Sequence, residues 1–284
     1  MRSSVRCATL LVLLAAPALA HPGVGIVMYR SGAVFYTDLE QVWRISPSGE
    51  KTVAVPDVHT HELWLDRDGT LYGEHLWYEG EESDRWGHRV WKRRPDGRIE
   101  TVIPPTEGFL TGYSFVRDSA GTMYWADRRE SGTVIRKRLA DGRILTHSTG
   151  PFRDVRWMSA TAGGTLHLTD GADLVRIGAD GRRTVLARGL RQSSWTRPHV
   201  GEHHNLMGVW SGRSGEVYVA VYGGGVVKRV RRDGKVEIAA RSPAFWGPTG
   251  GLTAPDGSLW LLESSLTNAV RVRRITPGGR ETVF

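Results

Sequence analysis

The sequence contains very little cysteine. Cys7 is the single cysteine among 284 residues, and it lies in an N-terminal segment that we expect to be removed. Disulfide bonds and cysteine-based metal sites are therefore excluded from the remainder of the chain. Long hydrophobic runs are also scarce. The run from Ala8 to Ala16 is too short to span a bilayer, so the sequence predicts no membrane span.

The N-terminal segment has the pattern of a secretory signal peptide. Arg2 and Arg6 precede the apolar run, and Ala18-Leu-Ala20 places small residues where signal peptidase cleaves. We expect residues 1–20 to be a signal peptide, residues 21–284 to be the mature domain, and the protein to be periplasmic or secreted. Cleavage there leaves His21 as an N-terminal residue able to bind copper through its amine and imidazole.

Charge of one sign is not concentrated in any segment, although the formal net charge is +8. The basic residues recur at a regular interval, which is typical of a solvated outer face rather than a patch for nucleic acid. We therefore expect no nucleic-acid partner. The recurring residues are Arg44, Lys92, Arg93, Arg136, Lys137, Arg176, Lys228, Arg229, Arg271 and Arg273.

Glycine is abundant, with 35 residues, and it marks an internal repeat. Each of six units has a glycine turn, an aliphatic–aromatic pair, a basic segment and a second glycine turn. A period of about 40–50 residues with two tight turns is the signature of four-stranded propeller blades. The first turns end at Gly32, Gly69, Gly121, Gly164, Gly215 and Gly257, and the second turns end at Gly49, Gly97, Gly142, Gly181, Gly234 and Gly279.

The repeat predicts an all-β fold, a six-bladed β-propeller of four-stranded antiparallel blades. Each blade is built from consecutive residues, so ring closure depends on packing between the first and last blades. The aromatic column that follows the first turns is expected to pack between neighbouring blades. His167 occupies that column, and we interpret it as structural. We expect a monomer.

The repeat also carries a family resemblance. The segment from Pro248 to Glu263, PTGGLTAPDGSLWLLE, resembles the repeat of NHL-type propellers and of the gluconolactonase (senescence-marker) superfamily. The resemblance implies the propeller fold and is nearly silent on activity, because one fold hosts many functions.

Deviations from the repeat point to the functional end of the ring. The first strand of a blade begins at the rim where its second strand ends, so both positions face the same channel mouth. In blade two, His75 stands where four of the other five blades have an acidic residue and blade five has Val221, and the longest intra-blade loop, from Leu76 to Arg89, follows it. That loop includes His88, which can reach the same rim.

Five histidines are predicted to converge on this channel mouth as metal ligands. His59 and His61 are two residues apart and lie on one face of a strand, His75 ends a second strand, and His203 and His204 come from the opposite blade. Imidazoles favour a divalent transition metal, with zinc as our first expectation and copper or calcium as alternatives. The alternative interpretation is that these rings hydrogen-bond loop backbones around a water-filled channel.

Four further residues complete the predicted catalytic site. Glu62 or Glu74 is the candidate general base, and Arg156 is the candidate for stabilising developing negative charge. The histidine-rich mouth resembles that of the amidating lyases of peptide hormones. This resemblance implies a zinc site of three histidines together with a tyrosine and an arginine, for which Tyr113 and Arg156 are the matching positions. Gluconolactonase-type enzymes imply instead a metal held by acidic and asparagine side chains, for which Glu62 and Asn205 are the matching positions.

The ligand is expected to be a small molecule, a glycan or a peptide. Trp77, Trp195 and Trp246 are candidate stacking surfaces on the same rim, and Asn205 is a candidate polar contact. Two functions remain open. One is a metal-dependent hydrolase (lactonase-like) or lyase, and the other is a non-catalytic NHL-type module that binds a protein or glycan through its rim loops.

Overall fold

The computed structural model describes residues 22–79, 82–83, 85–107, 115–197 and 200–284. Twenty-four strands in these residues form six antiparallel sheets of four, and each sheet uses consecutive strands. The predicted six-bladed β-propeller is therefore confirmed. No helix in the described ranges is long and apolar enough to cross a membrane.

The first three blades occupy the N-terminal half of the chain. Blade one comprises β1 (Ile26–Met28), β2 (Val34–Thr37), β3 (Val42–Ile45) and β4 (Lys51–Val55). Blade two comprises β5 (Leu63–Leu65), β6 (Leu71–Tyr78), β7 (Trp86–Arg93) and β8 (Ile99–Glu107). Blade three comprises β9 (Phe115–Arg117), β10 (Met123–Arg129), β11 (Gly132–Arg138) and β12 (Ile144–Ser148).

The other three blades follow in the same order. Blade four comprises β13 (Val155–Ala160), β14 (Leu166–Asp170), β15 (Asp173–Ile177) and β16 (Arg183–Ala187). The short helix α1 (Glu202–Asn205) precedes blade five, which comprises β17 (Leu206–Ser211), β18 (Val217–Val221), the 3-10 turn η1 (Tyr222–Gly224), β19 (Val226–Val230) and β20 (Val236–Arg241). Blade six comprises β21 (Trp246–Thr253), β22 (Leu259–Ser265), β23 (Val270–Ile275) and β24 (Glu281–Val283).

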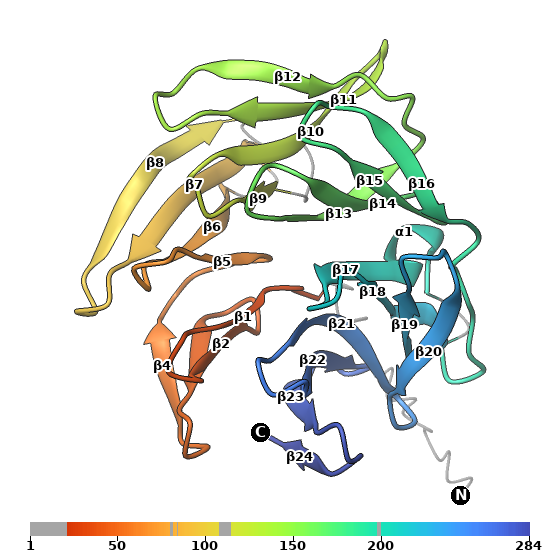
Figure 1. The fold of residues 1–284 in the computed structure, drawn as a ribbon. Helices are drawn as coiled ribbons and strands as arrows, with labels where there is room; N and C mark the ends of the chain where they lie inside the picture. Colours follow the sequence, from red (N-terminus) through yellow and green to blue (C-terminus); the bar gives the residue numbers. More distant parts are fainter. Residues whose placement is uncertain (1–21, 80–81, 84, 108–114, 198–199) are drawn as a thin grey trace, which may run out of the picture.

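The first strand of each blade lies nearest the central axis, and the fourth strand lies at the periphery (Figure 1). In the described part of the chain no strand crosses between blades, so blades one and six close the ring by packing, as the sequence predicts. Ile26 and Tyr36 of blade one share a hydrophobic cluster with Trp260 and Leu262 of blade six. Apolar burial at this seam takes the place of backbone pairing in holding the ring closed.

The turn glycines have the backbone conformation that the repeat requires. All twelve glycines that end the two sets of turns have φ between +79° and +94°, a region that is costly for residues with a Cβ atom. Gly69 has a second constraint, because a Cβ there would lie 2.5 Å from the Tyr29 ring of the neighbouring blade. This contact joins the turns of blades one and two.

Residues of the aromatic column make contacts between neighbouring blades. Tyr72 of blade two lies under the guanidinium of Arg117 from blade three, at 4.2 Å. The Nδ1 atom of His167 in blade four lies 3.2 Å from the Ser211 hydroxyl of blade five. This contact agrees with our interpretation of His167 as a residue that supports the fold.

One third-strand arginine departs from the expected solvated face. Arg273 is only 2% exposed, and its guanidinium lies 2.8 Å from Glu263, which is fully buried. Arg271 and Ser242 also bind the Glu263 carboxylate, at 2.8 Å and 2.7 Å. The side chain of Arg273 therefore turns into blade six, because a buried carboxylate needs a paired charge.

Candidate functional site

The channel has two different ends. We call the end where first strands begin and second strands finish the loop end, because it carries the inter-blade loops. The opposite end, formed by the tight turns between first and second strands, is the turn end. His59, His61 and His203 all precede the first strand of a blade. They therefore share the loop end, as the sequence predicts.

Blade two brings a carboxylate and a buried histidine together. Strand pairing sets Leu63 opposite Gly73, so the segment before β5 lies beside Glu74. The Nδ1 atom of His61 is 3.1 Å from Oε1 of Glu74, and the backbone N–H groups of His61 and Glu62 donate to the same carboxylate at 2.5 Å and 3.3 Å. Glu74 thus fixes the orientation of the His61 ring.

His59 and His75 extend this group towards the surface. Both are half-buried, and the His59 ring packs edge-on against His61 with ring centroids 4.8 Å apart. The backbone N–H of His59 donates to Nδ1 of His75 at 3.0 Å. In blade four, Asp170 accepts backbone N–H groups from the corresponding loop. His75 therefore replaces an acidic loop anchor, and its proton resides on Nε2.

The electrostatic environment keeps these imidazoles neutral. Burial lowers the pKa of His61 to about 4, and burial together with the charge of Arg89 lowers the pKa of His75 to about 4. Burial also lowers the pKa of His59, with a further contribution from His61. Burial raises the pKa of Glu74, against the opposing effect of its hydrogen bond from the His61 backbone. At neutral pH the histidines of this group are available as uncharged bases.

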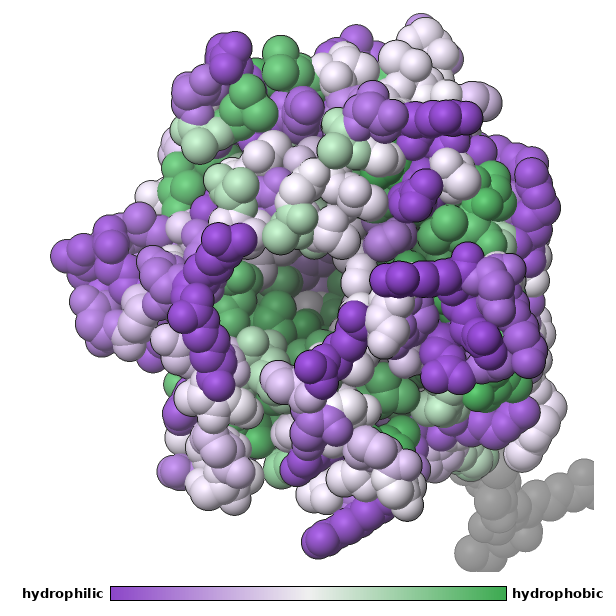
Figure 2. Space-filling model, viewed as in Figure 1, coloured by the Kyte–Doolittle hydropathy of each residue, from purple (hydrophilic) through white to green (hydrophobic). Residues whose placement is uncertain are grey.

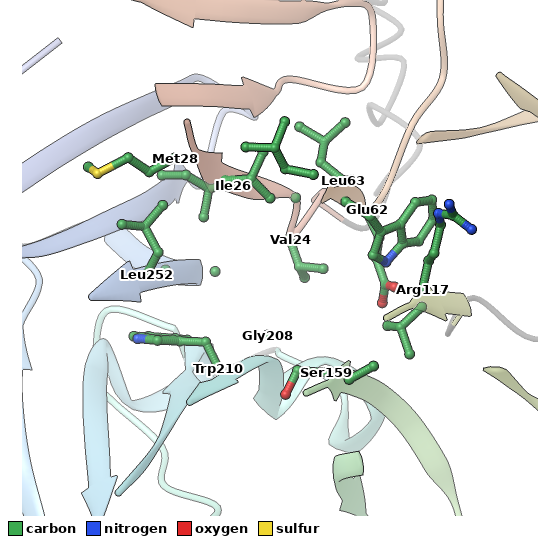
Figure 3. A pocket seen from close by; sticks show the side chains of 18 of the residues that line it. Val24, Ile26, Met28, Glu62, Leu63, Arg117, Ser159, Gly208, Trp210 and Leu252 are labelled. Carbon is green, nitrogen blue, oxygen red and sulfur yellow. The ribbon is translucent and has the colours of Figure 1, made fainter. Parts of the chain in front are cut away.

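Glu62 lies deeper in the channel than this group. It is buried, and its carboxylate points into the channel interior beside Val24 (Figure 3). Burial raises its pKa well above the usual range, the charge of Glu74 raises it further, and the backbone N–H of Phe115 opposes the shift. A carboxyl with this environment is protonated more readily than an exposed one.

A second polar group lies between blades four and five. Nε of Arg156 is 2.7 Å from Oδ1 of Asp154. Nδ1 of His203, on α1, is 2.9 Å from Nη2 of Arg156 and 3.0 Å from Oδ2 of Asp154. Burial lowers the pKa of the neighbouring His204, and the charge of Arg156 lowers it further. Asp154 was not predicted from the sequence. The signal that could have found it is its position directly before the first strand of blade four, which corresponds to the position of Thr60 to Glu62 before β5 of blade two.

The expected metal site is not formed by the described residues. Across the described ranges, no three His, Cys, Asp or Glu side chains are arranged to hold one ion. Hydrogen bonds engage the Nδ1 atoms of three of these rings: Nδ1 of His61 faces Glu74, Nδ1 of His75 accepts from His59, and Nδ1 of His203 faces Arg156 and Asp154. A metal at this end would therefore have to bind these rings through Nε2. Tyr113, together with His21, lies outside the described residues. A zinc ion held at this end therefore stays a prediction.

The predicted loop from Leu76 to Arg89 is largely strand, which corrects the sequence interpretation. β6 extends to Tyr78 and β7 begins at Trp86, because Leu76 pairs with His88 in a continuous ladder. His88 is consequently buried, only 2% exposed, and lowers the pKa of Glu74. The alternation of larger side chains across residues 86–90 (WGHRV) was the sequence signal that could have predicted this strand.

The four predicted ligand-binding residues take different roles. Trp195 is 82% exposed and lies 6.4 Å from the Phe245 ring, so it presents an open aromatic face. Trp246 lies under the guanidinium of Arg271 at 3.9 Å. Trp77 is half-buried on β6. Asn205 is buried, and its amide bonds both backbone groups of Gln192 at 3.0 Å. Asn205 therefore anchors a loop.

The depressed pKa of a structural histidine predicts pH-dependent stability. Burial, followed by the charge of Arg176, lowers the pKa of His167 from 6.5 to about 4. Between these values the unfolded chain binds a proton at this position and the folded chain does not, so the free energy of unfolding falls as pH falls from 6.5 to 4. We expect the Tm advantage of the wild type over His167→Gln to shrink between pH 7.5 and pH 4.5. A pH-independent difference in Tm would contradict this assignment.

Comparisons with known proteins show the fold. No family model matches the chain, and no curated protein is similar in sequence. A catalytically inactive histidine-to-alanine variant of virginiamycin B lyase from Staphylococcus aureus, with quinupristin, has a TM-score of 0.57 and 15% identity over 93% of this chain and 84% of that one. A gluconolactonase from Xanthomonas campestris has a TM-score of 0.59 and 12% identity, covering 89% and 86% of the two chains.

A third solved structure is of the same type. The calcium-binding protein regucalcin from Agrobacterium tumefaciens has a TM-score of 0.55 and 15% identity, covering 87% of this chain and 83% of that chain. The structural neighbours are therefore gluconolactonase-type and virginiamycin-lyase-type propellers, which confirms the predicted resemblance at the level of fold.

Proposed function

We propose that the protein is an enzyme that uses neutral histidines at the loop end as acid–base groups on an ester-containing or lactone-containing small molecule. One observation carries this proposal: Glu74 orients the buried His61, whose ring packs against the half-exposed His59. Glu74 fixes the buried His61 ring, and that ring in turn packs against His59, a base that solvent can reach. This arrangement suits proton transfer.

Two reactions are compatible with such a base. In lactone hydrolysis, His59 accepts a proton from water as the oxygen adds to the ester carbon, and the proton is then passed to the departing alkoxide. In elimination, His59 accepts a proton from carbon while the adjacent C–O bond breaks and leaves a carboxylate. Arg156, which pairs with Asp154 at the loop end, is the candidate for stabilising the oxygen that becomes anionic in either reaction.

The known activities of the structural neighbours supply the substrates for the test. We expect purified protein to turn over at least one compound in a panel of sugar lactones and quinupristin, with the product followed by mass spectrometry. Activity is expected to fall as pH drops through a value below 6.5, because the pKa of His59 is lowered and protonation removes the base. Parallel assays with EDTA, zinc and calcium report whether an ion takes part. Saturable binding without turnover of any compound would overturn the proposal.

A second function is favoured by one separate observation. Trp195 and Phe245 form an exposed aromatic pair from the loops on either side of blade five. Exposed aromatic rings of this kind bind sugars or peptide side chains by stacking. Binding without turnover, abolished by Trp195→Ala, is the result expected of the alternative, a non-catalytic module. We further propose that the protein is exported, on the basis of the N-terminal sequence pattern.

A further inference from the structure

The turn end of the channel opens into a cavity of about 650 Å³. Figure 2 shows a central hollow with hydrophobic residues on its walls and hydrophilic side chains around its opening. First strands and turns from all six blades line it. Its volume is within the range of small-molecule sites in proteins. The histidines considered above lie at the other end of the channel, so this cavity is a separate feature.

The walls of the cavity are mainly apolar. Ile26 and Met28 come from blade one, Leu63 from blade two, Trp210 from blade five and Leu252 from blade six, and all of them line the cavity (Figure 3). These side chains belong to the first strands, and both faces of those strands contribute to the lining. Such walls favour a hydrocarbon body over a strongly hydrated ligand.

The opening carries positive charge that the protein itself does not neutralise. Arg30 and Arg67 occupy the same position of the first turn in blades one and two, and both are exposed and line the cavity. Neither forms an ion pair with a described residue. Arg117, in contrast, is paired with Asp66 at 2.8 Å. Arg213 occupies the same turn position in blade five, lies outside the lining and donates a hydrogen bond to the carbonyl of Pro255.

The turns that carry Arg30 and Arg67 are in direct contact. The ring of Tyr29 lies over Gly69, where a Cβ atom would come within 2.5 Å of it. The two guanidinium groups are therefore presented by neighbouring turns of fixed relative position. Two guanidinium groups at one opening form a favourable site for a carboxylate.

The inner part of the cavity has a different polarity. Glu62, which precedes β5, points into it there. Ser159 lies nearer the turns, one residue before the end of β13, and contributes a buried hydroxyl that has no hydrogen-bond partner within the described part of the chain. All positively charged residues of the described lining, namely Arg30, Arg67 and Arg117, belong to the turns or to the strand ends beside them. An anionic group is therefore stabilised at the opening and not at the inner end.

We propose that the turn end is a binding site for an amphipathic carboxylate, whose apolar body enters the channel and whose carboxylate binds Arg30 and Arg67. A medium-chain fatty acid has this chemistry. The site lies at the opposite end of the channel from His59 and goes beyond the function proposed above. Its test requires no turnover.

Isothermal titration with decanoate tests the site directly. We expect saturable one-to-one binding, weaker binding of hexanoate by about three- to fourfold for each methylene removed, and little binding of decyltrimethylammonium. The double variant Arg30→Gln/Arg67→Gln should weaken decanoate binding about tenfold, because two charge-assisted contacts are lost. Raising the salt concentration should weaken binding in the wild type and have less effect in this variant.

Two further variants control for general effects of charge and of folding. Arg213→Gln removes the same charge from the same turn position outside the cavity, and it should leave affinity within about twofold. Ala162 is exposed at this turn position in blade four and lines the cavity, so Ala162→Arg should tighten decanoate binding about threefold. Equal affinity for decanoate and decyltrimethylammonium, equal losses in the Arg213 and Arg30/Arg67 variants, or no saturation at millimolar decanoate would each overturn the proposal.

Discussion

Replacing His59 by glutamine is expected to lower kcat/KM about 10²- to 10⁴-fold, the range associated with loss of a general base. His59 packs against the buried His61 ring that Glu74 orients, and as a half-buried residue it can be reached by solvent and substrate. Glutamine keeps a polar side chain but cannot accept a proton at neutral pH. The loss should therefore appear mainly in kcat, measured by initial rates on whichever lactone or ester the panel identifies.

His167→Gln is the matched control for this experiment. His167 also has a pKa lowered by burial, but it lies in the aromatic column and bonds Ser211 of the next blade. The His167→Gln substitution should reduce stability and leave kcat/KM within about twofold of the wild-type value. A comparable loss of activity in both variants would show that His59 acts only through the fold.

Glu74→Gln separates positioning from catalysis in the same group. The charge of Glu74 raises the pKa of His59, so its removal should move the acidic limb of the pH–rate profile to lower pH. A purely structural role for Glu74 predicts a lower Tm with an unshifted profile. Glutamine has one acceptor oxygen, so it can retain the hydrogen bond from the backbone of His61 but loses the one from Glu62, which goes to the other carboxylate oxygen.

Replacing Arg273 by methionine is expected to reduce the free energy of unfolding by about 2–3 kcal/mol, because Glu263 loses charge-assisted hydrogen bonds while Arg271 and Ser242 still bind its carboxylate. Arg273 is 2% exposed, and Glu263 is fully buried. Arg273 binds Glu263 through Nε and Nη2, at 3.1 Å and 2.8 Å, and also donates to the carbonyl of Arg241. Chemical denaturation followed by tryptophan fluorescence measures the change.

The neighbouring residue provides the control for this second prediction. Arg274 pairs with Asp256 at 2.7 Å, but the two side chains are 37% and 51% exposed. Solvent screens such a pair, so Arg274→Gln should change stability by less than about 1 kcal/mol. The double variant Arg273→Met/Glu263→Leu should recover part of the loss, because it removes both charges. Equal effects of Arg273→Met and Arg274→Gln would contradict the assignment of a buried pair.

Most of the fold was predictable because its determinants are local. A glycine with positive φ, such as Gly32 or Gly257, marks each turn within a few residues of the strands that it joins. Ring closure without a crossing strand also followed from the number of units. The buried position of Arg273 was not predictable, because third-strand arginines share one sequence pattern and differ only in what packs over them.

The candidate site was predictable in location but not in its contacts. The order of strands places His59, His61 and His203 at one end of the channel, and the sequence indicated this correctly. Whether Nδ1 of His75 is available depends on where the loop before β5 presents a backbone N–H. That position depends on inter-blade packing, which no short segment encodes.

The sequence by itself determined the number of blades, their strand order and the end of the channel at which the histidines gather. These properties depend on turns and periodicity within about 45 residues. Tertiary structure alone decided the partners of each ring, the buried pair of Arg273 with Glu263, and the cavity beneath Arg30 and Arg67. The physical reason is that hydrogen bonding, desolvation and cavity shape depend on distances between blades, and these distances arise only when the ring closes.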